Sequence, residues 1–231
     1  MDKDRYVGEF EGDHKHGKGV FYFDSGDVYY GQWKQNKKHG YGVYTWHDGK
    51  VYAGDFVEDK ITGKGTLTWP IGAKYKGEFE GGKRHGTGQM IYANGDKYFG
   101  DWRDNKRNGR GQIYYIEGRK YDGQFKDDKV HGKGQLIFSN RAKYNGEFQN
   151  NKIHGTGLMI YANGDKYSGD WRENKRNGKG KLIYANGAIY EGQMKDNKAH
   201  GQGKLIGING KMYIGEFENG NRKSNSDCTI F

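Results

Sequence analysis

The sequence predicts an all-β fold, an elongated single-layer antiparallel meander of about ten β-hairpin repeats of 23 residues each. Three observations support this prediction. Ten tyrosines follow one another at a spacing of 23 residues, most of the 41 glycines occupy fixed positions in this period, and aromatic residues make up 15% of a chain that is only 32% hydrophobic. A repeat of this length indicates small units that each bury an apolar face against their neighbours.

The first strand of each repeat begins at its tyrosine. Glycine follows two residues later, and Phe or Trp follows four residues later in nine of the ten units. Alternation of these residues with polar ones is typical of a half-buried strand. The repeats start at Tyr6, Tyr29, Tyr52, Tyr75, Tyr98, Tyr121, Tyr144, Tyr167, Tyr190 and Tyr213.

The second strand follows a Gly-x-Gly pair, as in residues 89–92 and 181–184. Successive repeats are joined by dipeptides such as Asn94-Gly95 and Asn163-Gly164. These suit a two-residue hairpin turn of the mirror-image type, in which both central residues need a positive φ. The other turn, inside each repeat, is predicted to be longer and basic, as in residues 104–109.

The repeat array is predicted to cover residues 1–220, and residues 221–231 form a short polar tail. A single sheet buries little apolar area, so cross-strand contacts between rings are expected to stabilise its aromatic face. Glycine is expected to let a neighbouring ring lie flat over the backbone. In one repeat, the residues expected to have this structural role are Tyr75, Gly77, Phe79, Gly86 and Gly88.

The repeated pattern is Tyr, any residue, Gly, then an acid or Gln, then Phe or Trp, and it is followed by His-Gly-x-Gly. It is seen at residues 75–79 and 85–88 and resembles the MORN (Membrane Occupation and Recognition Nexus) repeat family, over residues 6 to about 220. The resemblance implies a non-catalytic scaffold, similar to those at cytoskeleton–membrane junctions and in ciliary radial spoke heads, and it implies a tendency to form homodimers. Thr62, Asn108 and Asn177 depart from the usual His.

The residue patterns favour neither catalysis nor a cofactor or metal. One repeat position holds His16, His39, His85, His131, His154 and His200. Histidines of consecutive repeats would be about 10 Å apart, too far to share one ion. A second position holds the acids Glu9, Asp55, Glu78, Asp101, Glu147, Asp170 and Glu216, which are expected to accept hydrogen bonds from adjacent strands or turns, or to pair with lysines.

Basic residues gather in the predicted longer turns, so stacking of the hairpins is expected to line them along one edge of the sheet. With a net charge of +10, this edge is expected to contact an anionic membrane or an acidic partner. The alternative is a solvated turn face that limits aggregation. The predicted contact residues are Lys37, Lys38, Lys83, Arg84, Lys106, Arg107, Lys129, Lys152, Lys175, Arg176, Lys198, Arg222 and Lys223.

The chain ends in Cys228-Thr229-Ile230-Phe231, which matches the C-a-a-X signal for prenylation of Cys228. A final Phe indicates a geranylgeranyl group. The alternative is a coincidental exposed thiol. One lipid chain binds membranes only marginally, and a basic surface would supply the second signal that stable anchoring needs.

These observations predict a non-catalytic scaffold that tethers protein partners, including cytoskeletal ones, to the cytosolic face of an anionic membrane. The alternative is a structural component of a ciliary or cytoskeletal assembly that does not depend on a membrane. The expected location is accordingly either a cytoplasmic membrane face or a cilium or the cytoskeleton. Nucleic acid is disfavoured as a partner, because the aromatic residues hold the sheet together and no binding module is present.

Overall fold

The computed structural model describes residues 4–223 and 229–230 of the chain. All regular secondary structure in these residues is β-strand, which confirms the predicted fold class. The chain divides into two compact units, one that ends at Ile116 and one that begins at Glu117. Each unit is built from the same 23-residue hairpins.

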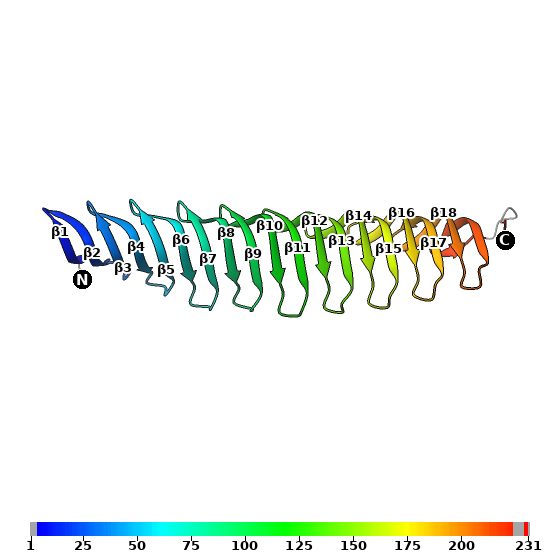
Figure 1. Cartoon of the computed structure of the whole chain (residues 1–231), viewed down its shortest axis with the longest axis horizontal. Coiled ribbons are helices and arrows are strands. Elements are labelled where there is room, and N and C mark those ends of the chain that lie inside the picture. Colours follow the sequence, from blue (N-terminus) through cyan, green and yellow to red (C-terminus); the bar gives the residue numbers. More distant parts are fainter. Residues whose placement is uncertain (1–3, 224–228, 231) are drawn as a thin grey trace. The chain divides into compact units, whose positions relative to one another are not determined.

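The strands alternate between seven and nine residues in length, as expected for a repeated hairpin. Unit 1 contains β1 (Arg5–Glu11), β2 (His14–Tyr22), β3 (Val28–Lys34), β4 (Lys37–Thr45), β5 (Val51–Val57), β6 (Lys60–Thr68), β7 (Lys74–Glu80), β8 (Lys83–Ile91), β9 (Lys97–Arg103) and β10 (Lys106–Tyr114). Unit 2 contains β11 (Lys120–Lys126), β12 (Lys129–Ile137), β13 (Lys143–Gln149), β14 (Lys152–Ile160), β15 (Lys166–Arg172), β16 (Lys175–Ile183), β17 (Ile189–Lys195), β18 (Lys198–Ile206), β19 (Met212–Glu218), β20 (Asn221–Arg222) and β21 (Thr229–Ile230). Within each unit, successive strands run side by side from β1 to β10 and from β11 to β18 (Figure 1).

Glycines set the register of the sheet in both units. From β1 to β10 and from β11 to β19, each strand pairs antiparallel with the next, and a glycine of one strand lies opposite a glycine of its neighbour, as in the pairs Gly77–Gly88 and Gly88–Gly100. The same pairing continues through unit 2, for example from Gly146 to Gly157. This glycine row confirms the predicted antiparallel meander.

The tyrosine of each repeat lies flat over the glycine row. A Cβ added to Gly88 would lie 2.3 Å from the Tyr75 hydroxyl oxygen, and one added to Gly77 would lie 2.6 Å from it. Tyr75 is fully buried, and its hydroxyl donates a hydrogen bond to the Glu78 carbonyl oxygen at 3.0 Å. Glycine is therefore required at both positions, because any larger side chain would collide with the ring.

Ring contacts connect neighbouring hairpins in both units. The Phe79 ring lies edge-on to the ring of Tyr75 in its own repeat and to that of Tyr52 in the preceding one, with both centroid distances 5.1 Å. Trp102 repeats this arrangement with Tyr75 and Tyr98. Such contacts contribute about 0.5–1.5 kcal/mol each beyond the area that they bury, so they form a large part of the core of a single-layer sheet.

The two kinds of turn are the reverse of those predicted from the sequence. The turn inside a repeat is the short one: Asp104 and Asn105 both have positive φ, 49° and 69°, and Lys106 already begins β10. The loop that contains Asn94-Gly95 is longer, and only Gly95 of that dipeptide has a positive φ. Asn and Asp tolerate the left-handed conformation better than other non-glycine residues, which is why a turn without glycine can take this form.

Within each unit, a short turn is fastened to the hairpin that precedes it. The Asn105 backbone N–H donates to the Arg84 carbonyl oxygen at 3.0 Å, and the Arg84 N–H donates to Asn105 Oδ1 at 2.9 Å. Asn174 and Ile153 form the same pair of bonds in unit 2. A turn residue therefore fixes the position of the preceding repeat as well as that of its own.

The row of acids predicted from the sequence accepts backbone hydrogen bonds, as expected. The pairing of β7 with β8 is irregular between Gly77 and Glu78, and Glu78 Oε1 accepts from the Thr87 hydroxyl at 2.6 Å and the Thr87 N–H at 3.1 Å. The hydroxyl of Thr87, followed by its N–H, holds the pKa of the Glu78 carboxyl below its usual value. Glycine at position 86 has a φ of +56°, and a Cβ there would meet the Glu78 carboxylate at 2.4 Å.

Candidate interaction surfaces

In each unit the predicted basic residues lie along the side of the sheet that carries the short turns, but they are divided between the two faces of the sheet. With the turns shorter than expected, these residues occupy the first two positions of the nine-residue strands, and the two positions point to opposite faces of the sheet. The first position holds Lys37, Lys83, Lys106, Lys129, Lys152, Lys175 and Lys198, and the second holds Lys38, Arg84, Arg107 and Arg176, with Arg222 at the second position of β20.

Cations at the second position lie over buried or half-buried aromatic rings. The Arg84 guanidinium is 4.4 Å from the centroid of the Trp102 ring, and Lys38 Nζ is 4.9 Å from that of Tyr44. Arg222 lies 5.1 Å from the Tyr213 ring in unit 2. Burial lowers the pKa of the Lys38 ammonium group. These side chains stabilise the aromatic face through cation–π contacts.

Lys37, Lys83, Lys152 and Lys175, all at the first position, pair with acids in the turn of the following repeat. Lys175 Nζ lies 2.9 Å from Asp196 Oδ1, Lys83 pairs with Asp104 at 3.1 Å, and Lys152 pairs with Glu173. We define the turn edge as the last residue of each first strand, the two turn residues and the first residue after them. From Glu11 to Asn221 these positions hold 13 Lys or Arg and 11 Asp or Glu, so the turn edge carries little net charge.

A second row of lysines, which the sequence analysis missed, lies on the sheet face opposite the buried tyrosines. In unit 2, residues of neighbouring strands lie opposite one another in the order Lys120, Ile137, Lys143, Ile160, Lys166, Ile183, which we call the lysine–isoleucine row. Ile160 and Ile183 are 36% and 38% exposed. Each lysine directly precedes a repeat tyrosine, so the sequence signal for this row was the Lys-Tyr dipeptide.

Lys143 and Lys166 differ from the turn-edge lysines in their surroundings. Both are exposed, and neither makes an ion pair within residues 4–223. Isoleucines lie opposite both lysines on each side, so apolar and cationic side chains alternate along the row. The same pattern is shorter in unit 1, where Ile91 lies opposite Lys74 on one neighbouring strand and opposite Lys97 on the other.

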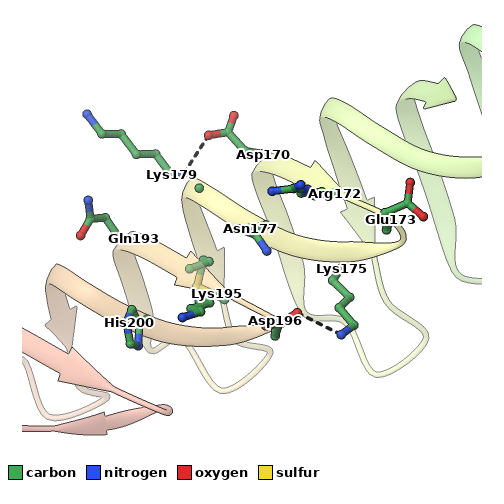
Figure 2. A pocket seen from close by; sticks show the side chains of 12 residues that line it. Asp170, Arg172, Glu173, Lys175, Asn177, Lys179, Gln193, Lys195, Asp196 and His200 are labelled. Atoms are coloured by element: carbon green, nitrogen blue, oxygen red, sulfur yellow. Dashed lines mark hydrogen bonds and ion pairs between the residues drawn. The ribbon is translucent and has the colours of Figure 1, made fainter.

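A hollow of about 810 Å³ lies at the turn edge of unit 2 (Figure 2). Its acidic lining residues already have partners. Asp170 accepts a hydrogen bond from the Lys179 N–H at 2.8 Å, and Asp196 pairs with Lys175. The hydrogen bond from Lys175 lowers the pKa of Asp196. The hollow therefore presents the ordinary contacts of the repeat rather than a separate arrangement of reactive groups.

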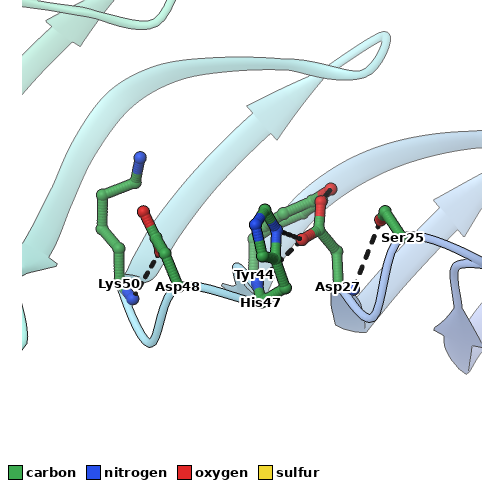
Figure 3. Close-up of polar contacts among 6 residues, drawn as sticks. All are labelled: Ser25, Asp27, Tyr44, His47, Asp48 and Lys50. Carbon is green, nitrogen blue, oxygen red and sulfur yellow. Dashed lines mark hydrogen bonds and ion pairs between the residues drawn. The ribbon is translucent and has the colours of Figure 1, made fainter.

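The loops that join repeats are connected by an aspartate (Figure 3). Asp27 accepts hydrogen bonds from the Tyr44 hydroxyl at 2.7 Å and from the His47 N–H at 2.8 Å. The Tyr44 hydroxyl is the main cause of the lowered pKa of Asp27. Asp165 accepts from the Ala185 N–H in the same way, which identifies this contact as part of the repeat.

The predicted row of histidines lies at the start of the nine-residue strands. His85 Nδ1 lies 3.3 Å from Glu80, and His16 Nδ1 lies 2.9 Å from Glu11, in each case within one hairpin. In the described part of the chain, no three His, Cys, Asp or Glu side chains come together as metal ligands would.

The C-terminal residues are only partly described. Lys223 pairs with Glu216 at 3.0 Å and Glu218 at 3.6 Å, and residues 221–222 and 229–230 of the predicted tail pair with β19. Cys228, the predicted prenylation site, lies outside the described residues. None of the described residues belongs to a helix that could span a membrane.

Solved structures with detectable similarity share little sequence with this chain. A complex of the TCP domain of SAS-4 (dCPAP) from Drosophila melanogaster with a proline-rich motif of Ana2 (dSTIL) is 21% identical over 69% of this chain and 89% of that one, with a TM-score of 0.41. The TCP10 domain of CPAP from Danio rerio, in complex with a STIL peptide, is 11% identical over 95% and 96% of the two chains, with a TM-score of 0.36. Scores this low support no inference about function. No curated protein matches the sequence.

The family comparison agrees with the repeat geometry. The MORN repeat model matches residues 6–28, 29–51, 52–74, 75–97, 98–118, 121–143, 144–166, 167–189 and 190–212. Eight of these nine matches begin and end where the 23-residue period places the repeat boundaries. The chain therefore belongs to the MORN repeat family.

Proposed function

We propose that this MORN repeat chain is a non-catalytic scaffold that holds protein partners at the cytosolic face of an anionic membrane. The lysine–isoleucine row is the observation that carries the proposal. Its lysines are about 10 Å apart, two strand spacings, and face away from the buried rings. A lysine near an acidic leaflet contributes about 1 kcal/mol to the free energy of membrane binding, and the isoleucines add apolar contact at the headgroup boundary.

Prenylation of Cys228 is the second part of the proposal. A single lipid chain gives marginal, reversible membrane binding, so the lipid and the lysine–isoleucine row would act together. The proposed membrane contact is therefore the lysine–isoleucine row and not the turn edge. The turn edge is nearly neutral, whereas Lys143 and Lys166 retain unpaired charge in unit 2.

Co-sedimentation with phosphatidylserine-containing vesicles tests the role of the row. The double variant Lys143→Gln and Lys166→Gln is expected to bind at least about tenfold more weakly than the wild type, because two lysines contribute about 1 kcal/mol each. The matched control, Lys152→Gln and Lys175→Gln, removes the same charge from the turn edge and is expected to bind as the wild type does. A loss confined to the control would place the contact at the turn edge instead.

The lipid arm of the experiment uses protein isolated from eukaryotic cells. Cys228→Ser is expected to reduce vesicle binding, and mass spectrometry of the wild-type C-terminus should show the isoprenoid. Negligible binding by both proteins would refute the membrane proposal.

Protein partners are supported by exposed aromatic and aliphatic side chains on the first hairpins of unit 1. Tyr30, Tyr41 and Val7 are 57%, 59% and 55% exposed. Tyrosine is enriched in protein interfaces because it combines an apolar ring with a polar hydroxyl. The same observation favours the second candidate function, a structural part of a ciliary or cytoskeletal assembly. Detergent-resistant retention in axonemes without dependence on Cys228 would favour that function over the first.

A further inference from the structure

A hollow of about 650 Å³ lies on the face of unit 1 that is opposite the buried tyrosines. Phe99 of β9 and Tyr114 of β10 line it, together with Ile116, which follows β10. We call these three residues the aromatic notch. The Phe99 and Tyr114 rings are perpendicular, with a centroid distance of 6.0 Å. The two strands thus present two rings and an aliphatic side chain to solvent at one place.

The fold itself does not require the side chains of the aromatic notch. Residues 164–185 of unit 2 repeat residues 95–116 with an offset of 69 positions, and they form the same hairpin from β15 and β16. Ser168, Ile183 and Ala185 stand there in place of Phe99, Tyr114 and Ile116. The buried tyrosine of this hairpin is the same in both units, as Tyr98 and Tyr167. Larger apolar side chains gathered on an exposed surface add nothing to the core, so they indicate contact with another molecule.

The exposure of the aromatic notch favours a peptide over a small molecule as its ligand. Phe99 and Tyr114 are each 39% exposed, and Ile116 is 74% exposed. A pocket for a small molecule usually encloses about 70–90% of the ligand surface, which a notch between such exposed side chains does not do. An extended segment of a partner protein, in contrast, needs to place only one of its sides against the rings.

The strands around the aromatic notch favour a peptide in the polyproline II conformation. Because β9 pairs with β8 on one side and with β10 on the other, a peptide cannot join the sheet there as a further strand. An amphipathic helix needs a continuous apolar strip, whereas Gln112 lies opposite Phe99 and Lys97 lies opposite Tyr114. Proline-rich segments need neither, because they have no internal hydrogen bonds and dock against exposed aromatic rings.

Lys97 places a positive charge beside the rings. Its side chain lines the hollow, is exposed and makes no ion pair within the described part of the chain. The neighbouring acid, Asp96, is already engaged, because its two carboxylate oxygens accept hydrogen bonds from the Ile116 N–H and from Asn94 Nδ2, both at 2.9 Å. The charge of Lys97 is therefore complementary to an acidic residue of the ligand.

We propose that the aromatic notch binds a proline-rich segment of a partner protein, with prolines against the Phe99 and Tyr114 rings and an Asp or Glu of the segment paired with Lys97. This inference rests on the part of the proposed function in which the chain holds protein partners. It does not depend on membrane binding.

Selection from a phage-displayed library of random peptides, with the full chain as bait and no vesicles present, tests the class of ligand. We expect the selected peptides to be rich in proline and to contain Asp or Glu. In fluorescence anisotropy, Phe99→Ser together with Tyr114→Ile should weaken binding of a selected peptide at least about tenfold, because both ring contacts are lost. Serine and isoleucine occupy the equivalent positions of unit 2, so the fold already accommodates them. Lys97→Gln should weaken binding about two- to fivefold, as expected for an exposed ion pair, and the matched control Lys76→Gln should not.

The reverse substitutions test whether these side chains are sufficient. Ser168→Phe, Lys181→Gln, Ile183→Tyr and Ala185→Ile together build the same notch beside Lys166, the equivalent of Lys97. Titration should then give two peptide sites per chain instead of one. Selected peptides that bind the wild type and the Phe99→Ser, Tyr114→Ile variant equally would overturn this site but leave the scaffold function standing. A selection that yields no binder, or only binders without proline, would overturn the proposed ligand, whereas the membrane part of the function is judged by the vesicle experiment alone.

Discussion

Tyr75 and the two glycines beneath it show how much of this fold depends on contact between a ring and the backbone. The ring occupies the space in which the Cβ atoms of Gly77 and Gly88 would lie. Because a single-layer sheet has no second layer to cover it, the buried tyrosines must themselves form the core. In this chain all ten repeats have the tyrosine and the glycine two residues after it.

Substitution of Gly88 by alanine tests this contact. The added Cβ would lie 2.3 Å from the Tyr75 hydroxyl oxygen, so the ring must move. We expect Gly88→Ala to lower the free energy of unfolding by about 1–3 kcal/mol, the usual cost of overpacking. Denaturant unfolding would measure it. Gly207→Ala is the control: its Cβ would come no closer than 3.0 Å to Asn209 Oδ1, and its effect should stay within about 0.5 kcal/mol.

The buried tyrosines also predict loss of stability at high pH. Burial raises the pKa of Tyr75 and Tyr167 from 10.0 to about 12, and it raises those of Tyr29, Tyr52 and Tyr144 further. The folded state thus keeps protons that the unfolded state loses. The contribution of these tyrosines to the free energy of unfolding is fully present below pH 10, and it decreases as the pH rises towards about 12.

Circular dichroism and tyrosinate absorbance, followed together during an alkaline titration, would check this prediction. We expect loss of β-structure to coincide with ionisation of the buried tyrosines. Ionisation of all 19 tyrosines near pH 10 without unfolding would contradict it.

At the scale of the single hairpin, the short turn is the least predictable element. Sequence rules favour glycine where φ is positive, and they therefore assigned the mirror-image turn to Asn94-Gly95. The structure instead places positive φ at Asp104 and Asn105, where hydrogen bonds to Arg84 of the preceding hairpin fasten the turn. Turn rules consider only neighbouring residues, so they cannot predict contacts between residues 21 positions apart.

Gln35 offers a direct test of the turn assignment. It has a φ of +50°, which costs glutamine more than asparagine. We expect Gln35→Asn to raise the free energy of unfolding by up to about 1 kcal/mol. Gln149→Asn is the control, since Gln149 ends β13 with ordinary strand geometry, and asparagine there should be neutral or slightly destabilising. Equal effects in denaturant unfolding would argue against the assignment.

At the scale of the whole molecule, the period, the strands and the aromatic core could be predicted from the sequence, because each repeats at fixed spacing. The basic surface could not, since its prediction depended on where the turns end. Lys83 and Arg84 were predicted in a turn but lie in β8, where successive side chains point to opposite faces. Lys83 forms an ion pair with Asp104, and Arg84 lies over the Trp102 ring. The lysine–isoleucine row was missed for the same reason.

The regular period predicts that a whole repeat can be removed from the chain. Deleting residues 144–166 joins Lys143 to Tyr167, so that Lys143 takes the place of Lys166 and every glycine keeps a glycine opposite it. We expect this protein to unfold cooperatively. A control that deletes residues 146–167 leaves one extra residue between Tyr144 and Gly169 inside a strand, so that this tyrosine and glycine no longer share a face, and it should lose stability severely. Similar unfolding curves for both deletions would contradict the prediction.

The fastening of each hairpin to its immediate neighbours has a consequence for synthesis. Asn174 bonds to Ile153, 21 residues before it, and Trp171 bonds to Gly157, 14 residues before it, so these contacts join neighbouring hairpins in the described part of the chain. The entropy lost on closing such short loops is small. A ribosome-bound chain can therefore assemble its first hairpins while later ones are still being translated.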